Sequence, residues 1–173
     1  MPMSDTQPPP DEPEKVGGER TMLAGWLDYH RAVLRHKCAG LDDEQLRRRS
    51  CEPSNLSLLG LVCHLTDVER GWFLRGVAGR TSREVPPLYY SDEDPEGDFD
   101  NVAAADTRAV FATYEQAIAD IRAATADADL DRAFDNGGSP CSVRWVYQHM
   151  VEEYARHNGH ADLLRERIDG ATG

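Results

Sequence analysis

The strongest constraint on the fold is an amphipathic pattern near the C-terminus, over residues 143–168. Apolar residues recur there at intervals of three and four, the spacing that gathers side chains on one face of an α-helix. The members of this stripe are Val143, Val146, Tyr147, Met150, Tyr154, Ala161 and Leu164. The segment therefore predicts a long helix that packs one face against a core.

Similar periodicity predicts three further long helices, over residues 19–37, 57–77 and 102–126. A short helix is expected over residues 41–49, capped by Asp42 or Asp43. The segments 79–101 and 127–140 predict irregular connections, the second with a turn at residues 136–138. No segment has a convincing strand pattern. The sequence therefore predicts an all-α protein, a four-helix bundle, in which the long connection between the second and third helices permits a crossover.

Composition limits the location and the partners of the protein. A chain of 173 residues fits one domain, which we expect to span residues 19–173. Residues 1–18 are rich in Pro and acidic side chains and are expected to form a disordered tail. A net charge of −12 opposes binding to nucleic acid or to an anionic membrane. The sequence has no run of about 18 apolar residues and no apolar N-terminal segment, so we expect a cytoplasmic location.

The four cysteines are scattered along the chain without CxxC spacing. This pattern favours reduced structural thiols over a disulfide framework or a cysteine zinc site. Cys63 precedes His64 and points about 100° away from it around the helix. The chain therefore offers no obvious nucleophile of its own.

Polar side chains interrupt the apolar faces of two predicted helices. Glu153 and His157 are four residues apart, so they lie one turn apart on the same face, with His149 one turn before them. His64 lies on the apolar face of the helix predicted over residues 57–77. A buried carboxylate needs a cation or strong donors nearby. Glu153, His157 and His64 are therefore candidate ligands of one metal ion.

Each of these residues also has a simpler explanation. His64 alone fits a hydrogen-bonded core histidine, and Glu153 with His157 fits a surface pair on one helix. His149 fits either the interior or a residue that orients a ligand. His160 is a competing ligand that lies about 60° off the stripe of Glu153 and His157. The combination of three favours a metal site, and three protein ligands leave coordination positions open, as in catalytic sites.

The acidic segment SDEDPEGDFD partly matches a calcium-binding loop. Asp92, Asp94, Glu96, Gly97 and Asp98 occupy its first, third, fifth, sixth and seventh positions. The twelfth position, which needs a bidentate Glu, is Ala103, and Pro95 interrupts the loop. A solvated acidic loop is therefore the favoured interpretation.

Two long stretches, SLLGLVCHLTDVERGWF and VRWVYQHMVEEYARHNGHADLLRERIDG, resemble the DinB-like metalloenzyme superfamily. The closer resemblance is to its actinobacterial branch, which is related to mycothiol-dependent maleylpyruvate isomerase and mycothiol S-transferases. It implies a four-helix bundle with a long crossover and the metal ligands His64, Glu153 and His157. The isomerase carries a further C-terminal domain that helps build its active site, whereas this sequence stops at Gly173, so we do not expect isomerisation of maleylpyruvate, and thiol transfer stays open.

The resemblance implies a thiol S-transferase that conjugates mycothiol, or a similar low-molecular-weight thiol, to a small electrophile. The expected cofactor is a divalent metal ion: zinc first, with nickel or iron as alternatives. Two other functions stay open: a non-catalytic metal-binding stress or sensing protein, and a non-haem iron enzyme, since two His and one carboxylate also suit Fe(II). We expect a monomer or a homodimer.

Two further sets of residues are candidates for supporting roles. Asp67, near His64 on the same helix, could orient that histidine, or it could be a surface carboxylate. Arg80, Arg83 and Arg156 could contact polar groups of the thiol. Nothing in their spacing selects one of the three.

Overall fold

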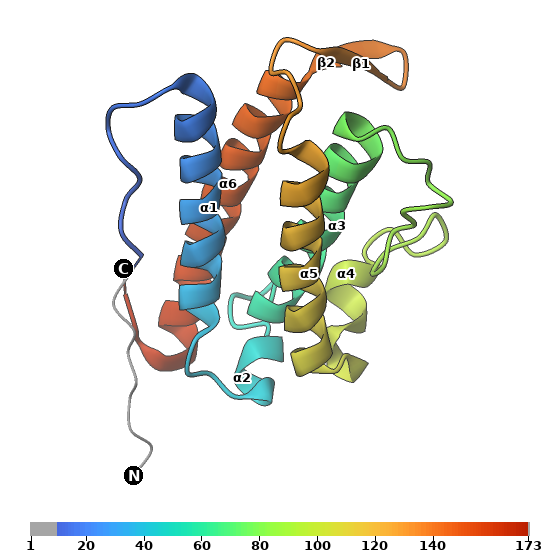
Figure 1. The fold of residues 1–173 in the computed structure, drawn as a ribbon. Coiled ribbons are helices and arrows are strands. Elements are labelled where there is room, and N and C mark those ends of the chain that lie inside the picture. Colours follow the sequence, from blue (N-terminus) through green and yellow to red (C-terminus); the bar gives the residue numbers. More distant parts are fainter. Residues whose placement is uncertain (1–9, 173) are drawn as a thin grey trace.

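The computed structural model describes residues 10–172 and is mainly helical, as the sequence predicted (Figure 1). Its long helices are α1 Glu19–Cys38, α3 Leu58–Glu69, the π-helix η1 Arg70–Val77 that continues α3, α5 Thr107–Thr125 and α6 Val143–Asp169. The colours in Figure 1 show that α1 and α6 run in one direction, whereas α3 and α5 run in the other. Because α3 and α5 run the same way, residues 78–106 return along the molecule before α5 begins.

Polar caps define where the helices begin. The side chains of Ser57, Asp106 and Ser142 each accept a hydrogen bond from a backbone N–H in the first turn of α3, α5 and α6, respectively. The third long helix therefore begins at Thr107, and the predicted start at residue 102 was wrong. Residues 101–104 instead form the 3₁₀-helix η2 Asn101–Ala104, which follows α4 Gly97–Asp100. Asp42 caps α2 Asp43–Arg47 through a capping box, so of the two predicted caps, Asp42 and Asp43, the first is confirmed.

A two-stranded antiparallel hairpin precedes α6, and the expectation of no strands was wrong there. Its strands are β1 Ala133–Asn136 and β2 Ser139–Ser142. Gly137 and Gly138 both have positive φ, 64° and 92°, so the turn is where the sequence predicted it. Each strand is only four residues long, and one holds a proline, so alternation of apolar residues could not reveal them.

The N-terminal tail is described only in part. The predicted disorder of residues 1–9 lies outside the described residues. In residues 10–18, Pro13 lies against the backbone of Gly25, where an added Cβ would be 3.1 Å from the proline ring. Within residues 10–172, no helix has the length and apolar content that crossing a membrane requires.

A buried charged cluster links all four long helices. Arg31 of α1 donates two hydrogen bonds to the carboxylate of Glu69, at the end of α3. The hydroxyl of Tyr154 in α6 also donates to Glu69, and it lies 2.9 Å from the hydroxyl of Tyr114 in α5. Glu69 is 1% exposed and Arg31 is 4% exposed. The two charges are therefore paired within the core, with the tyrosine hydroxyls completing their hydrogen bonds.

We expect Glu69→Ala to lower the free energy of unfolding by about 3–5 kcal/mol, because Arg31 would stay buried with only the partly exposed carboxylate of Asp28 as an ionic partner. Urea denaturation measures this change. The exposed pair between Arg35 and Glu115 gives a matched control, and Glu115→Ala should cost about 1 kcal/mol or less. A cost for Glu69→Ala as small as that of Glu115→Ala would contradict the role assigned to the cluster.

Candidate metal centre

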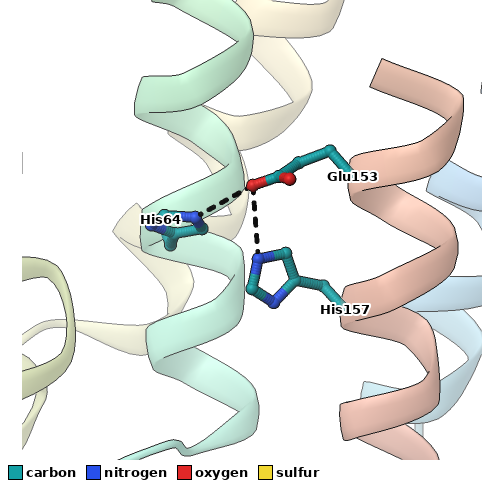
Figure 2. Close-up of side chains that lie close together, drawn as sticks. All are labelled: His64, Glu153 and His157. Atoms are coloured by element: carbon teal, nitrogen blue, oxygen red, sulfur yellow. Dashed lines mark ion pairs between the residues drawn. The ribbon is translucent and has the colours of Figure 1, made fainter. Parts of the chain in front are cut away.

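Two helices bring His64, Glu153 and His157 together. His64 projects from α3, and Glu153 and His157 project from successive turns of α6 (Figure 2). Glu153 and His157 are buried and His64 is half-buried, so the cluster lies at the edge of the core. The three sequence-predicted ligands therefore meet at one place, although their role as metal ligands stays a prediction.

One carboxylate oxygen lies between the two imidazoles. Glu153 Oε1 is 3.5 Å from His64 Nε2 and 3.4 Å from His157 Nε2 (Figure 2). One ligand atom from each residue lies within 4.8 Å of the other two. In a tetrahedral zinc site with bonds of about 2.0–2.2 Å, neighbouring ligand atoms lie about 3.3–3.6 Å apart. The donor types and the two carboxylate–imidazole distances therefore fit a divalent cation.

Asp98 of α4 orients His64. Its Oδ2 lies 2.7 Å from His64 Nδ1, and its side chain is buried. Because a carboxylate accepts the Nδ1 proton, the neutral imidazole of His64 has its lone pair on Nε2, the nitrogen that faces Glu153. Asp98 belongs to the segment expected to be a solvated acidic loop, so that expectation was wrong for this residue.

A glycine allows the acidic connection to reach His64. The ring of Phe99 stacks on the His64 imidazole with 5.2 Å between ring centroids. A Cβ added to Gly60, one turn before His64, would lie 2.8 Å from the Phe99 ring. Glycine at position 60 therefore permits the close packing of α4 on α3.

Asp67 does not contact His64, and its proposed orienting role was wrong. Its carboxylate accepts hydrogen bonds from the backbone N–H groups of Leu88 and Tyr89 and from the side chain of Arg70. Asp67 is 2% exposed, so it is not a surface carboxylate either. Its contacts fasten the connection after η1 to α3.

The competing histidines lie beside the cluster of three. His160 Nδ1 is 3.3 Å from His157 Nδ1, so it contacts the nitrogen of His157 that faces away from Glu153. His149 stacks on Trp145 with ring centroids 4.7 Å apart, and it also contacts Trp72 edge-on. His160 therefore contacts a candidate ligand, whereas His149 belongs to an aromatic cluster.

Burial and neighbouring charges shift the pKa values of both candidate histidine ligands. Burial lowers the pKa of His64, but the hydrogen bond and charge of Asp98, with Glu153, outweigh it and place that pKa above its usual value. Burial and the neighbouring His64 lower the pKa of His157 to about 4. His157 is therefore neutral near pH 7 and has a lone pair to donate.

A pocket of about 620 Å³ opens beside His64. Its wall includes Asp98 and, from η1, Trp72 and Arg75. A second pocket of about 550 Å³ shares Trp72 with the first and lies against Trp145 and the hairpin. Of the three candidate ligands only His64 lines the first pocket, so there is room for a small molecule beside this histidine.

The three arginines proposed as contacts of the thiol, Arg80, Arg83 and Arg156, differ in their positions relative to the pockets. Arg80 and Arg83 are exposed and line neither pocket, and Arg156 pairs with Glu152 and with Glu153, whose Oε2 lies 3.1 Å from its Nη1. Arg75 was not predicted as a site residue from the sequence. The sequence places Arg75 eleven residues after His64 in one predicted helix. The side of the helix on which it lies could not be predicted, because the change from α- to π-helix alters that side.

The cysteines supply no nucleophile to the centre. Cys38 and Cys63 are buried, and burial raises the pKa of each thiol to about 12. Cys51 and Cys141 are partly exposed but line neither the His64 pocket nor the candidate centre. No cysteine therefore lines the pocket beside His64, although Cys141 lines the second pocket.

These features define a mainly helical protein with a two-histidine, one-carboxylate candidate metal centre beside a pocket. The family model of the mycothiol S-transferases matches residues 22–170. The chain belongs to this family, which confirms the resemblance drawn from its sequence. A comparison with curated proteins found no match.

We expect Asp98→Asn to lower the affinity of the protein for zinc by about 10–100-fold, because the histidine would lose the carboxylate that fixes its tautomer. Competition with a chromophoric chelator measures the affinity. Asp92→Asn is the control, since it removes the same charge from an exposed position of the same connection. Equal losses in the two variants would show that bulk charge, and not the contact with His64, is responsible.

A thiol count tests the burial of the cysteines. Ellman's reagent should modify Cys51 and Cys141 in the native protein and all four cysteines in denaturant, since only these two are partly exposed. In a variant with Cys51→Ser and Cys141→Ser, the native protein should not react. Rapid native modification of Cys63 would refute the conclusion that the site lacks its own thiol nucleophile.

Proposed function

We propose that the protein is a divalent-metal-dependent S-transferase that conjugates mycothiol to a small electrophile. The proposal rests chiefly on one observation: a carboxylate and two imidazole nitrogens converge beside a pocket in a chain of the mycothiol S-transferase family. Zinc is the proposed ion, because His and carboxylate ligands in tetrahedral geometry suit it. We also propose that the four long helices form a DinB-like four-helix bundle, with residues 78–106 as the crossover.

Each residue of the centre has a distinct part in this proposal. His64, Glu153 and His157 would hold the ion, which would favour the thiolate form of a bound thiol by its positive charge. In the neutral imidazole of His64, Asp98 would hold the proton on Nδ1, so that Nε2 is the nitrogen with a lone pair for the ion. Arg156 pairs with the outer oxygen of Glu153, so Oε1 is the oxygen that faces the histidines. These contacts fix the three donor atoms before any ligand binds.

The proposed reaction is a substitution at carbon. The thiol gives up its proton to water, its sulfur forms a bond to the electrophilic carbon, and the leaving group departs with the electron pair of the broken bond. The pocket beside His64 would hold the two reactants in contact, which lowers the entropic barrier to their reaction. The absence of a usable cysteine agrees with a nucleophile brought in by the cosubstrate.

We expect zinc-loaded protein to accelerate conjugation of mycothiol to monobromobimane above the uncatalysed rate, as measured by fluorescence. Glu153→Ala should abolish the excess rate and reduce zinc affinity by more than the about 10–100-fold typical of residues that only orient a ligand. Glu152→Ala is the matched control, because Glu152 is the exposed neighbour of Glu153 on the same helix. Circular dichroism should show that both variants keep their helices.

The alternatives give different results in the same assay. A protein that binds zinc through the three residues but turns over no thiol, across several thiols and electrophiles, would be a metal-binding protein without catalysis. Turnover that needs Fe(II) and oxygen but no thiol would identify a non-haem iron enzyme. Equal activity of Glu153→Ala and Glu152→Ala would refute the proposed centre.

A further inference from the structure

Arg75 is a charged residue of the pocket wall without a partner. Among residues 10–172, its guanidinium makes no ion pair or hydrogen bond, although it lines the pocket beside His64. The carboxylates of the same wall are all engaged: Asp67 with backbone N–H groups and Arg70, Asp98 with His64, and Asp135 with the N–H of Gly138. The pocket therefore offers one free cation and no free anion from its aspartates.

The guanidinium of Arg75 lies back over Gly71, in the direction of His64. A Cβ added to Gly71 would lie 2.8 Å from Arg75 Nη2, so glycine provides the space that the guanidinium occupies. Side chains on a helix tilt toward its N-terminus, which for Arg75 is the end that holds His64. Gly71 is seven residues beyond His64, roughly 10 Å along the axis at α-helical rise. The cation is therefore near enough to the candidate metal centre for one small molecule to reach both.

The π-helical geometry of η1 presents Arg75 to the pocket. Gly71, Trp72, Arg75 and Gly76 all belong to Arg70–Val77, and all four line the cavity. The wider π turn places residues four and five apart on one side, and such turns are frequent at functional sites. Gly76 is also covered by the ring of Phe134 from the hairpin, and the next two hairpin residues, Asp135 and Asn136, line the pocket.

We propose that Arg75 binds a carboxylate of the electrophilic substrate, and that the protein prefers electrophiles with an anionic group several ångströms from the reacting carbon. The assignment of the anion to the electrophile rests on the proposed function. A guanidinium binds a carboxylate through two parallel N–H···O bonds, and a partly enclosed site strengthens this contact. The protein has a net charge of −12, which repels anions in general. An unpaired guanidinium in the pocket would attract an anionic ligand to that one place.

A benzene ring with a carboxylate opposite its reacting carbon is a suitable probe, because it holds the two groups apart rigidly and Trp72 in the same pocket wall offers an aromatic surface for the ring. Dinitrobenzoate and dinitrobenzamide form a matched pair of probes that differ in charge and little in size. Both can be followed by quenching of tryptophan fluorescence in metal-free protein, which requires no turnover. Their chlorinated forms serve as electrophiles in the conjugation assay.

We expect the wild-type protein to bind dinitrobenzoate about tenfold or more tightly than dinitrobenzamide, the scale of one charged hydrogen-bonded contact. Arg75→Gln should remove this preference and leave the affinity for the amide unchanged. Gly71→Ala should reduce the preference as well, because it keeps the charge of Arg75 but displaces its guanidinium. Arg108→Gln, at an exposed position of α5, is the control for net charge and should have no effect.

Equal binding of the two probes by the wild-type protein would overturn this inference, as would loss of the preference in Arg108→Gln to the same degree as in Arg75→Gln. These failures are distinct from failure of the proposed function. If no thiol is conjugated but dinitrobenzoate binding depends on Arg75, the anion site stands and the transferase assignment fails. If conjugation occurs, but neither its rate nor the affinity for the probes changes with the carboxylate or with Arg75→Gln, the transferase assignment stands and the anion site fails.

Discussion

The buried carboxylate of Glu69 is the contact on which the rest of the structure depends. It pairs with Arg31 and accepts from Tyr154, which in turn contacts Tyr114, so one side chain joins α1, α3, α5 and α6. A buried charge demands its partners, since its desolvation is offset only when the hydrogen bonds are complete. The helices are consequently held in one relative position and not merely packed by apolar contacts.

The same cluster sets the geometry of the candidate metal centre. Glu69 follows His64 by five residues on one helix, and Tyr154 directly follows Glu153 on another. The contact between Glu69 and Tyr154 therefore fixes how close the His64 and Glu153 backbones lie. With the backbones at this separation, the Glu153 side chain is long enough to place Oε1 between the two imidazoles, 3.5 Å from His64 Nε2 and 3.4 Å from His157 Nε2.

The sequence was sufficient to predict features that depend on short-range periodicity. The long helices and the convergence of His64 with Glu153 and His157 follow from residues at helical spacing on apolar faces, supported by the family resemblance. The residue that orients His64 was not predictable in this way. Asp98 lies 34 residues from His64, in an acidic connection whose composition suggested solvent exposure. Only the docking of Phe99 at Gly60 brings it to the histidine.

The pocket wall shows a second limit of prediction from sequence. The residues 70–77 continue an amphipathic helical pattern, and nothing in that pattern distinguishes a π-helix from an α-helix. The side that Arg75 presents to the pocket depends on this difference. The hairpin that lines the pocket is equally hidden, because its strands are only four residues long, one of them holds a proline, and neither alternates apolar with polar residues.

The most direct test of the account is X-ray absorption at the zinc edge of the purified, zinc-loaded protein. We expect one zinc ion per chain, bound by two imidazole nitrogens and one carboxylate oxygen at about 2.0–2.2 Å. His64→Ala should remove one of the imidazole signals and lower occupancy. A spectrum dominated by sulfur at about 2.3 Å, or one unchanged by His64→Ala, would contradict the proposed centre.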